Sequence, residues 1–239
     1  MIPIRDTVRA QRFPIVNTLL IILNGLVFWF ELSLEGRELE QFIFTFGLIP
    51  ARFWTIEDTN AWAPVFTSMF IHGGWLHLIS NMLALYIFGD NIEDRMGHAR
   101  YLIFYLLGGV LAGLVHAWAY PASLTPTVGA SGAIAAILGA YLILYPNARV
   151  ITLVPFPLFF FFPILEIPAL VYLGVWFFSQ LLNGAFSLTG STFQEGGVAW
   201  WAHIGGFLVG VILVKLFTAG RPQRRLGRYE YYPDEYYPW

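Results

Sequence analysis

Three apolar segments of the chain carry polar side chains that could do chemistry together. Ser131 opens an apolar run that extends to Tyr145, while His203 and the pair His77 and Asn81 stand in two other apolar runs, at a similar distance from one end. A serine hydroxyl becomes a nucleophile when an imidazole takes its proton, and further hydrogen-bond donors can stabilise the oxyanion that forms. The sequence therefore offers a nucleophile, a general base and an oxyanion hole at one depth of a bilayer.

Each of these residues also has a structural interpretation. Ser131 could be a small residue in a tight helix crossing, because small residues let helices approach closely. His203 could make a purely structural hydrogen bond inside a span. His77 and Asn81 are four residues apart, so they share one helical face and could form a polar clamp between helices. His72 could order the loop before this face or complete its polar cluster.

The glycine pattern after His203 favours the catalytic interpretation. Gly206 and Gly210 form a GxxxG face one turn below the histidine. The segment that follows Ser131 has a small face of its own, so the two helices can pack closely. We expect this approach to bring the imidazole within about 3 Å of the hydroxyl, as general-base catalysis requires. The residues of the second small face are Gly129, Gly132, Ala136 and Gly139.

The composition is that of a membrane protein. Hydrophobic residues make up 57% of the 239 positions and charged residues 12%, which is too apolar for an ordinary soluble domain. The net charge of -2 argues against a nucleic-acid partner. The chain has no cysteine, which excludes disulfides, thiolate metal sites and a cysteine nucleophile.

Six stretches have the length and hydropathy of a transmembrane helix, which needs about 20 apolar residues. We interpret the first as a retained helix rather than a cleaved signal peptide. The predicted fold is an all-α polytopic bundle, with a segment 1-13 before a core at 14-217 and a tail at 218-239. The six predicted spans are 14-34, 64-89, 98-120, 129-146, 164-188 and 198-217.

The distribution of Lys and Arg predicts the orientation. With the N-terminus inside, eleven of these residues fall on the cytoplasmic side and only Arg37 and Arg52 fall outside. This excess places both termini in the cytoplasm and requires an even number of spans. We further expect a mixed loop at 35-63 in the outer interface, an aromatic inner connector at 156-162, and a disordered or membrane-bound tail.

In their order along the chain, these patterns resemble the rhomboid family of intramembrane serine proteases. The resemblance covers about residues 14 to 217, and an additional element, Glu93-x-Arg95, follows the second span. Three elements carry it: His72-x4-His77-x3-Asn81, Gly129-Ala130-Ser131-Gly132, and Ala202-His203-x2-Gly206-x3-Gly210.

The resemblance implies a protease with Ser131 as nucleophile and His203 as general base. It implies an oxyanion hole built from the Ser131 backbone N–H and the side chains of His77 and Asn81, and a structural role for Glu93-x-Arg95 in the inner loop. No acid lies near His203 in its span, so the arrangement reads as a dyad rather than a Ser-His-Asp triad.

The sequence departs from the family pattern at two places. Ala135 stands where members often have an aromatic residue stacked on the histidine, so something else must orient His203. Trp62-Ala63-Pro64 replaces a Trp-Arg pair common in the first loop, which affects loop packing more than catalysis.

The resemblance also predicts the substrates and how they reach the site. We expect single-span membrane proteins cut near the outer face of a bacterial plasma (inner) membrane, with membrane lipid as the other partner and with no metal or cofactor. We predict span 164-188 as the substrate gate through Trp176, Phe177 and Phe178, which could instead be ordinary lipid-facing aromatics. Two other functions stay open: a catalytically silent family member that binds and escorts membrane proteins, and a small transporter.

Overall fold

Helices make up most of the chain that the structure describes. The computed structural model describes residues 1–55, 62–155, 163–188 and 198–221. Three short strands accompany the helices: β1 (Ile2–Asp6), β2 (Arg149–Leu153) and β3 (Ile164–Pro168). The helices are α1 (Ile15–Glu31), α2 (Arg37–Phe46), α3 (Pro50–Phe53), α4 (Ala63–Thr67), the 3-10 helix η1 (Ser68–Phe70), α5 (Trp75–Met96), α6 (His98–Ala119), α7 (Ser131–Leu144), α8 (Ala169–Ser187) and α9 (Trp200–Phe217).

Several of these helices have the length and apolar composition of membrane spans. Among the described residues α6, α8 and α9 are long and apolar enough to cross a bilayer, and α1 and α7 are apolar but shorter. The chain is therefore a mostly helical membrane protein, while the count of six spans stays a prediction.

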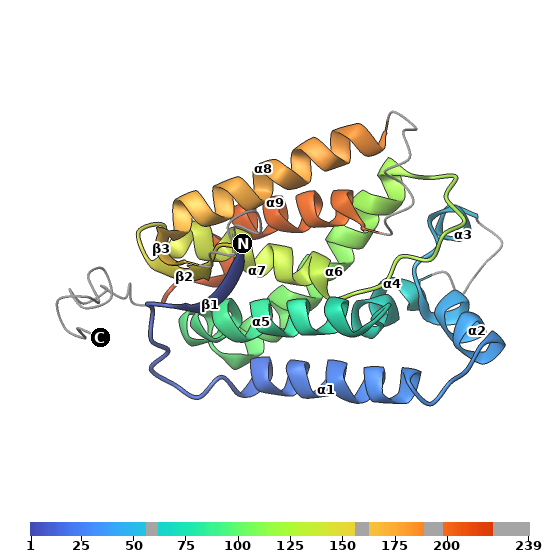
Figure 1. The fold of residues 1–239 in the computed structure, drawn as a ribbon, viewed down its shortest axis with the longest axis horizontal. Coiled ribbons are helices and arrows are strands. Elements are labelled where there is room, and N and C mark those ends of the chain that lie inside the picture. The colour runs from blue at the N-terminus through green and yellow to red at the C-terminus, as the bar shows by residue number, and fades with distance from the viewer. Residues whose placement is uncertain (56–61, 156–162, 189–197, 222–239) are drawn as a thin grey trace.

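The helix that begins at Ser131 lies in the middle of the bundle. In Figure 1, α7 runs between α9 and α8 on one side and α5 and α1 on the other. All residues from Gly132 to Tyr141 are buried, whereas α8 buries only a few of its residues. A helix that is apolar all round belongs inside a protein, so the sequence of α7 itself selects this central position.

Small residues bring α7 and α9 into contact along their backbones. A methyl group on Gly206 would lie 2.1 Å from the carbonyl oxygen of Gly132, and one on Gly210 would lie 2.0 Å from that of Ala136. On the facing side, a methyl group on Gly139 would lie 2.2 Å from the Phe207 carbonyl oxygen. We call this contact the glycine seam. The predicted small faces therefore meet through Gly132, Ala136 and Gly139 on α7, whereas Gly129 lies in the loop before this helix.

Glu93 joins the start of α1 to the end of α5. Its two carboxylate oxygens accept hydrogen bonds from the backbone N–H groups of Val16 and Asn17, at 2.9 and 2.7 Å. Such N–H groups in the first turn of a helix have no partner within the helix. Glu93 and Arg95 were expected in a loop, but both lie in the last turns of α5, which continues to Met96. Gly97, with φ of +80°, then allows the sharp turn into α6.

A small antiparallel sheet corrects the expectation of an all-α fold. Strand β2 lies between β1 and β3, so the expected segment 1-13 is partly a strand. The Asp6 carboxylate accepts hydrogen bonds from the Tyr141 hydroxyl and, at 3.0 Å, from the Asn91 side chain. Helical periodicity does not report such pairing, because a strand finds its partners far along the chain.

Two predicted spans begin later than expected. Residues 164–168 form β3, so the span predicted at 164-188 is helical only from Ala169. The span predicted at 64-89 starts with α4 and η1, and its long helix begins at Trp75, after Gly74. The loop predicted at 35-63 contains α2 and α3. The connector at 156-162 and most of the tail lie outside the described residues.

The glycine seam predicts that adding a single methyl group to it pushes α7 and α9 apart. Gly210→Ala would place a carbon against the Ala136 carbonyl, and overpacking of this kind costs about 1–3 kcal/mol. We expect its free energy of unfolding in detergent to fall by that amount. Gly174→Ala is the matched control, because a methyl group there meets nothing within 4 Å, and it should leave stability equal or slightly raised. Equal stability of the two variants would contradict the seam.

Candidate active site

Ser131 and His203 meet where α7 and α9 begin. Ser131 is the first residue of α7, and His203 lies in the first turn of α9. The Ser131 Oγ and the His203 Nε2 are 2.8 Å apart, which is hydrogen-bond distance. Both residues are only partly buried, as groups that must reach a substrate have to be. The contact expected from the sequence is therefore present.

The glycine seam produces this contact and accounts for Ala135. Gly132 follows Ser131, and Gly206 follows His203 by three residues, so the closest approach of the two backbones lies next to both side chains. A methyl group on Gly206 would already be 3.1 Å from the Ala135 Cβ. A larger side chain at position 135 would push α9 away from α7.

The other nitrogen of His203 contacts a residue that the sequence analysis did not single out. The Nδ1 atom lies 2.8 Å from the Oε1 atom of Gln180 on α8. Gln180 is 5% exposed. An amide in an apolar span is costly to bury without a partner, and this cost was the signal available in the sequence.

His77 and Asn81 lie beside the loop that leads to Ser131. Gly129 has φ of +122°, and a Cβ atom there would lie 2.6 Å from the His77 Nε2 and 3.8 Å from the Asn81 Nδ2. Only glycine fits both this backbone conformation and this space. The loop therefore passes directly against the two predicted hydrogen-bond donors.

The hydrogen bonds of these two residues leave donors free on the side of Gly129. The Gly73 backbone N–H donates to the His77 Nδ1 at 3.4 Å, so the proton of a neutral His77 ring lies on Nε2. The Asn81 Nδ2 is buried and has no hydrogen-bond partner among the described residues. Ser131 adds a backbone N–H at the positive end of α7. Together these groups could hold an oxyanion.

His72 supports this cluster from behind. Its ring is 1% exposed and packs edge-on against the His77 ring, with 5.0 Å between the centroids. Its backbone N–H donates to the carboxylate of Glu31 at the end of α1, at 3.1 Å. The position of His72 fits a role in ordering the loop before α5 and the ring of His77.

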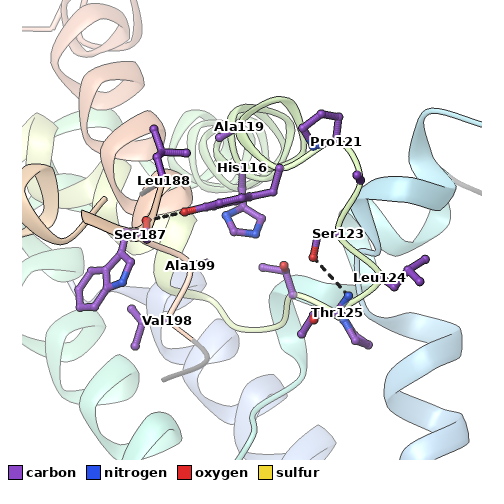
Figure 2. Close-up of a pocket in the computed structure, with 15 residues that line it drawn as sticks. His116, Ala119, Pro121, Ser123, Leu124, Thr125, Ser187, Leu188, Val198 and Ala199 are labelled. Carbon is purple, nitrogen blue, oxygen red and sulfur yellow. Dashed lines mark hydrogen bonds between the residues drawn. The ribbon is translucent and has the colours of Figure 1, made fainter. Parts of the chain in front are cut away.

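A cavity of about 660 Å³ opens at the end of the bundle where α7 and α9 begin. Its wall includes Thr127, four residues before Ser131, and Trp200, three residues before His203. Figure 2 shows the ring of His116 among the lining residues, and a hydrogen bond between Tyr120 and Ser187 that joins the ends of α6 and α8. The sequence analysis did not single out His116, which is 8% exposed and whose Nδ1 has no hydrogen-bond partner in the described part of the chain.

The three predicted gate residues have different surroundings. The Trp176 ring lies 6.0 Å from the His203 ring, and the Phe177 ring stacks on Phe207 at 4.4 Å. Phe178 is 59% exposed on the outer side of α8. Two of the three aromatics therefore face α9 rather than lipid.

Nothing in the described part of the chain groups three or more His, Asp or Glu side chains so that they could hold a metal ion.

Comparison with known proteins gives a consistent result. A family model described as "Rhomboid domain" matches residues 59–220. The chain is similar to Rhomboid protein 1, mitochondrial, of Saccharomyces cerevisiae, with 31% identity over 150 residues that make up 61% of this chain and 39% of that protein. It is 30% identical to Rhomboid-like protein 11, chloroplastic, of Arabidopsis thaliana over 82% of this chain and 66% of that protein.

A bacterial relative carries a protease name. The chain is 27% identical to Rhomboid protease AarA of Providencia stuartii over 214 residues, which are 81% of this chain and 69% of that protein. The chain spans less than two thirds of the length of the yeast and Arabidopsis relatives.

The free donor on Asn81 predicts a measurable effect on the reactivity of Ser131. When Ser131 attacks a serine-directed phosphonate, negative charge develops on a phosphoryl oxygen, and loss of one donor to such an oxygen typically costs about 10²–10³ in rate. We expect Asn81→Ala to slow labelling of Ser131 by roughly one to three orders of magnitude, because the other two donors remain. Ser80→Ala, at an exposed position on the same helix, is the control and should label normally. Unchanged labelling of Asn81→Ala would assign Asn81 to packing alone.

Proposed function

Because the chain belongs to the rhomboid family, we propose that it is an intramembrane serine endopeptidase that cuts transmembrane segments with Ser131 and His203. The observation that carries this proposal is the 2.8 Å contact between the Ser131 hydroxyl and the His203 imidazole. A family member that only binds membrane proteins has no need of this pair.

Catalysis would follow the order of acyl transfer. The Ser131 Oγ attacks the scissile carbonyl carbon while the His203 Nε2 takes the hydroxyl proton. The oxyanion accepts hydrogen bonds from the Ser131 backbone N–H, the His77 Nε2–H and the Asn81 Nδ2–H. The intermediate then expels the amine, which receives the proton from His203. Water attacks the acyl-enzyme with His203 again as base, and this step releases the acid and restores Ser131.

The substrates we propose are single-span membrane proteins. A helix keeps its carbonyls in internal hydrogen bonds, so a substrate must unwind locally before Ser131 can attack. Helix-breaking residues near the scissile bond should assist this step, and a small residue before that bond fits the family resemblance.

We also propose the six-span topology with both termini in the cytoplasm, in a bacterial plasma membrane, with the dyad near the outer face. The orientation is supported by the distribution of Lys and Arg, because it places eleven of these residues on the cytoplasmic side and two on the outer side.

We propose that a substrate reaches the dyad by displacing α8 from α5. The two helices meet at their inner halves, where the Tyr172 ring lies 6.4 Å from Phe88. Nearer the dyad, α8 is held to α9 by the stacked pair Phe177 and Phe207. At these rings a tilt into lipid exchanges one apolar surrounding for another, and it breaks the hydrogen bond between Gln180 and His203.

The dyad predicts that two single substitutions abolish cleavage. In liposomes, wild-type protein should cut a membrane-embedded reporter, whereas Ser131→Ala and His203→Ala should each retain under about one part in 10³ of the turnover. The double variant should lose little more, because the two residues act as one unit. Ser80→Ala is the control. Binding of the reporter by wild type without any cleavage would contradict the proposal and fit a silent family member.

The gate predicts different effects at two neighbouring phenylalanines. Phe177→Ala removes the stack on Phe207, so α8 should tilt more easily, and cleavage of a helical reporter should rise about two- to tenfold, since a lost aromatic pair is worth about 0.5–1.5 kcal/mol. Phe178→Ala changes an exposed ring and should leave the rate unchanged. Labelling of Ser131 by a small phosphonate should be equal in both. Equal cleavage rates in the two variants would mean that access lies elsewhere.

A further inference from the structure

The imidazole of His203 is held at both nitrogens, by Ser131 on one side and by Gln180 on the other. We infer that Gln180 is the positioning residue of the base: its Oε1 atom accepts the Nδ1–H of His203, which leaves the Nε2 lone pair free for the Ser131 hydroxyl. This inference rests on the proposed function and names a third member of that same site.

The hydrogen bonds of the Gln180 amide fix which of its ends faces the histidine. The Nε2 atom lies 3.1 Å from the Trp176 carbonyl oxygen and 2.9 Å from the Ser179 Oγ. The Ser179 hydroxyl gives its own proton to the same carbonyl, at 2.6 Å, so its oxygen is free to accept. A carbonyl can only accept, and a flipped amide would set the Gln180 oxygen against it. The oxygen of Gln180 therefore faces His203.

An accepting oxygen at Nδ1 determines the tautomer of the ring. A neutral imidazole has one donor nitrogen and one acceptor nitrogen, and the bond made by one nitrogen sets the role of the other. With the proton held on Nδ1, the Nε2 atom that contacts Ser131 is the acceptor. In the other tautomer Nε2 would carry a proton and could not take one from the hydroxyl.

The surroundings of the ring explain why an amide is needed and suits this place. Trp176 packs at 35° to the His203 ring and Trp200 at 87°, with centroids 6.0 and 6.2 Å away. These contacts confine the ring plane but do not choose its tautomer. Ala135 is too small to stack on the ring. A neutral amide supplies the acceptor without the cost of burying a carboxylate in an apolar bundle.

Three variants separate this role from simple packing. Gln180→Met keeps the length of the side chain but has no oxygen to accept from Nδ1, and Gln180→Glu keeps an accepting oxygen. Asn183→Leu is the matched control, because the Asn183 side chain, one turn further along α8, donates to the Ser179 carbonyl. Each protein is reconstituted in liposomes and assayed with the membrane-embedded reporter across pH.

We expect Gln180→Met to lower kcat by roughly 10- to 100-fold, a part of the 10²–10⁴ that a general base contributes, with KM within about twofold of wild type. At the alkaline plateau Gln180→Glu should recover most of the lost kcat. Asn183→Leu should match wild type in both constants. A rise in KM with kcat unchanged in Gln180→Met would overturn the inference. A Gln180→Glu protein with a kcat no better than that of Gln180→Met would also overturn it.

A second measurement reads the tautomer without activity. In ¹⁵N-histidine protein in detergent, with the His203 signals assigned through a His203→Asn variant, wild type above the imidazole titration should show a protonated Nδ1 and an unprotonated Nε2. Gln180→Met should show a mixture of both tautomers. An unchanged tautomer in a folded Gln180→Met protein would overturn the inference. The proposed function would still stand in that case if the wild-type protein cleaves the reporter. Absence of cleavage by wild type would instead count against the proposed function.

Discussion

The distance between the backbones of α7 and α9 is the constraint on which the site depends. Helices in lipid gain little from burying apolar surface against one another, so they associate through close packing of small residues. Here the carbonyl oxygens of Gly132 and Ala136 lie where side chains on Gly206 and Gly210 would have to be. Ser131 and His203 stand at the end of this contact, and their 2.8 Å separation follows from it. The same closeness excludes a bulky residue at position 135, so the means of holding the imidazole had to come from another helix, α8.

Polar side chains connect the helices that surround α7 and α9, and each one contacts a backbone or side-chain group on a different element. Glu93 of α5 receives the first N–H groups of α1, and Glu31 at the other end of α1 receives the backbone N–H of His72. One helix is thus held at both ends, and its second attachment orders the residue that packs on His77. Gln180 attaches α8 to α9 in a similar way. Under the proposed gate, this last attachment would link substrate access to chemistry, because a tilt of α8 that admits a substrate would break the contact between Gln180 and His203, and α8 would have to return before the base could act.

The sequence predicted the parts of this structure that arise from local pattern. The apolar runs gave the positions of α1, α6, α7 and α9 within a few residues, and the glycine spacing after His203 predicted the α7–α9 contact. It did not predict the sheet, because β1 lies far from β2 in the chain and β3 reads as the start of the next helix. Gln180 was missed for a related reason. Its partner is 23 residues away on another helix, and only the free energy of burying an amide marks it. The assignment of His77 and Asn81 as oxyanion donors remains a prediction that the geometry accommodates.

The shortness of α7 has a consequence for the medium in which the dyad works. Its 14 residues span about 21 Å, against about 30 Å of hydrocarbon, so in the proposed six-span topology the segment before Ser131 would complete the crossing without helical hydrogen bonds. The backbone groups of this segment instead make hydrogen bonds with residues outside the long helices. Thr127 exchanges two backbone hydrogen bonds with Leu48, and the Gly129 N–H donates to the Ser68 carbonyl oxygen. The space left above the helix is the cavity lined by Thr127, His116 and Ser187. At about 30 Å³ per molecule it has room for on the order of 20 waters. In the proposed topology and function, this cavity would admit water into the bilayer, where the water would stabilise a transient imidazolium and oxyanion and supply the second reactant of the hydrolysis.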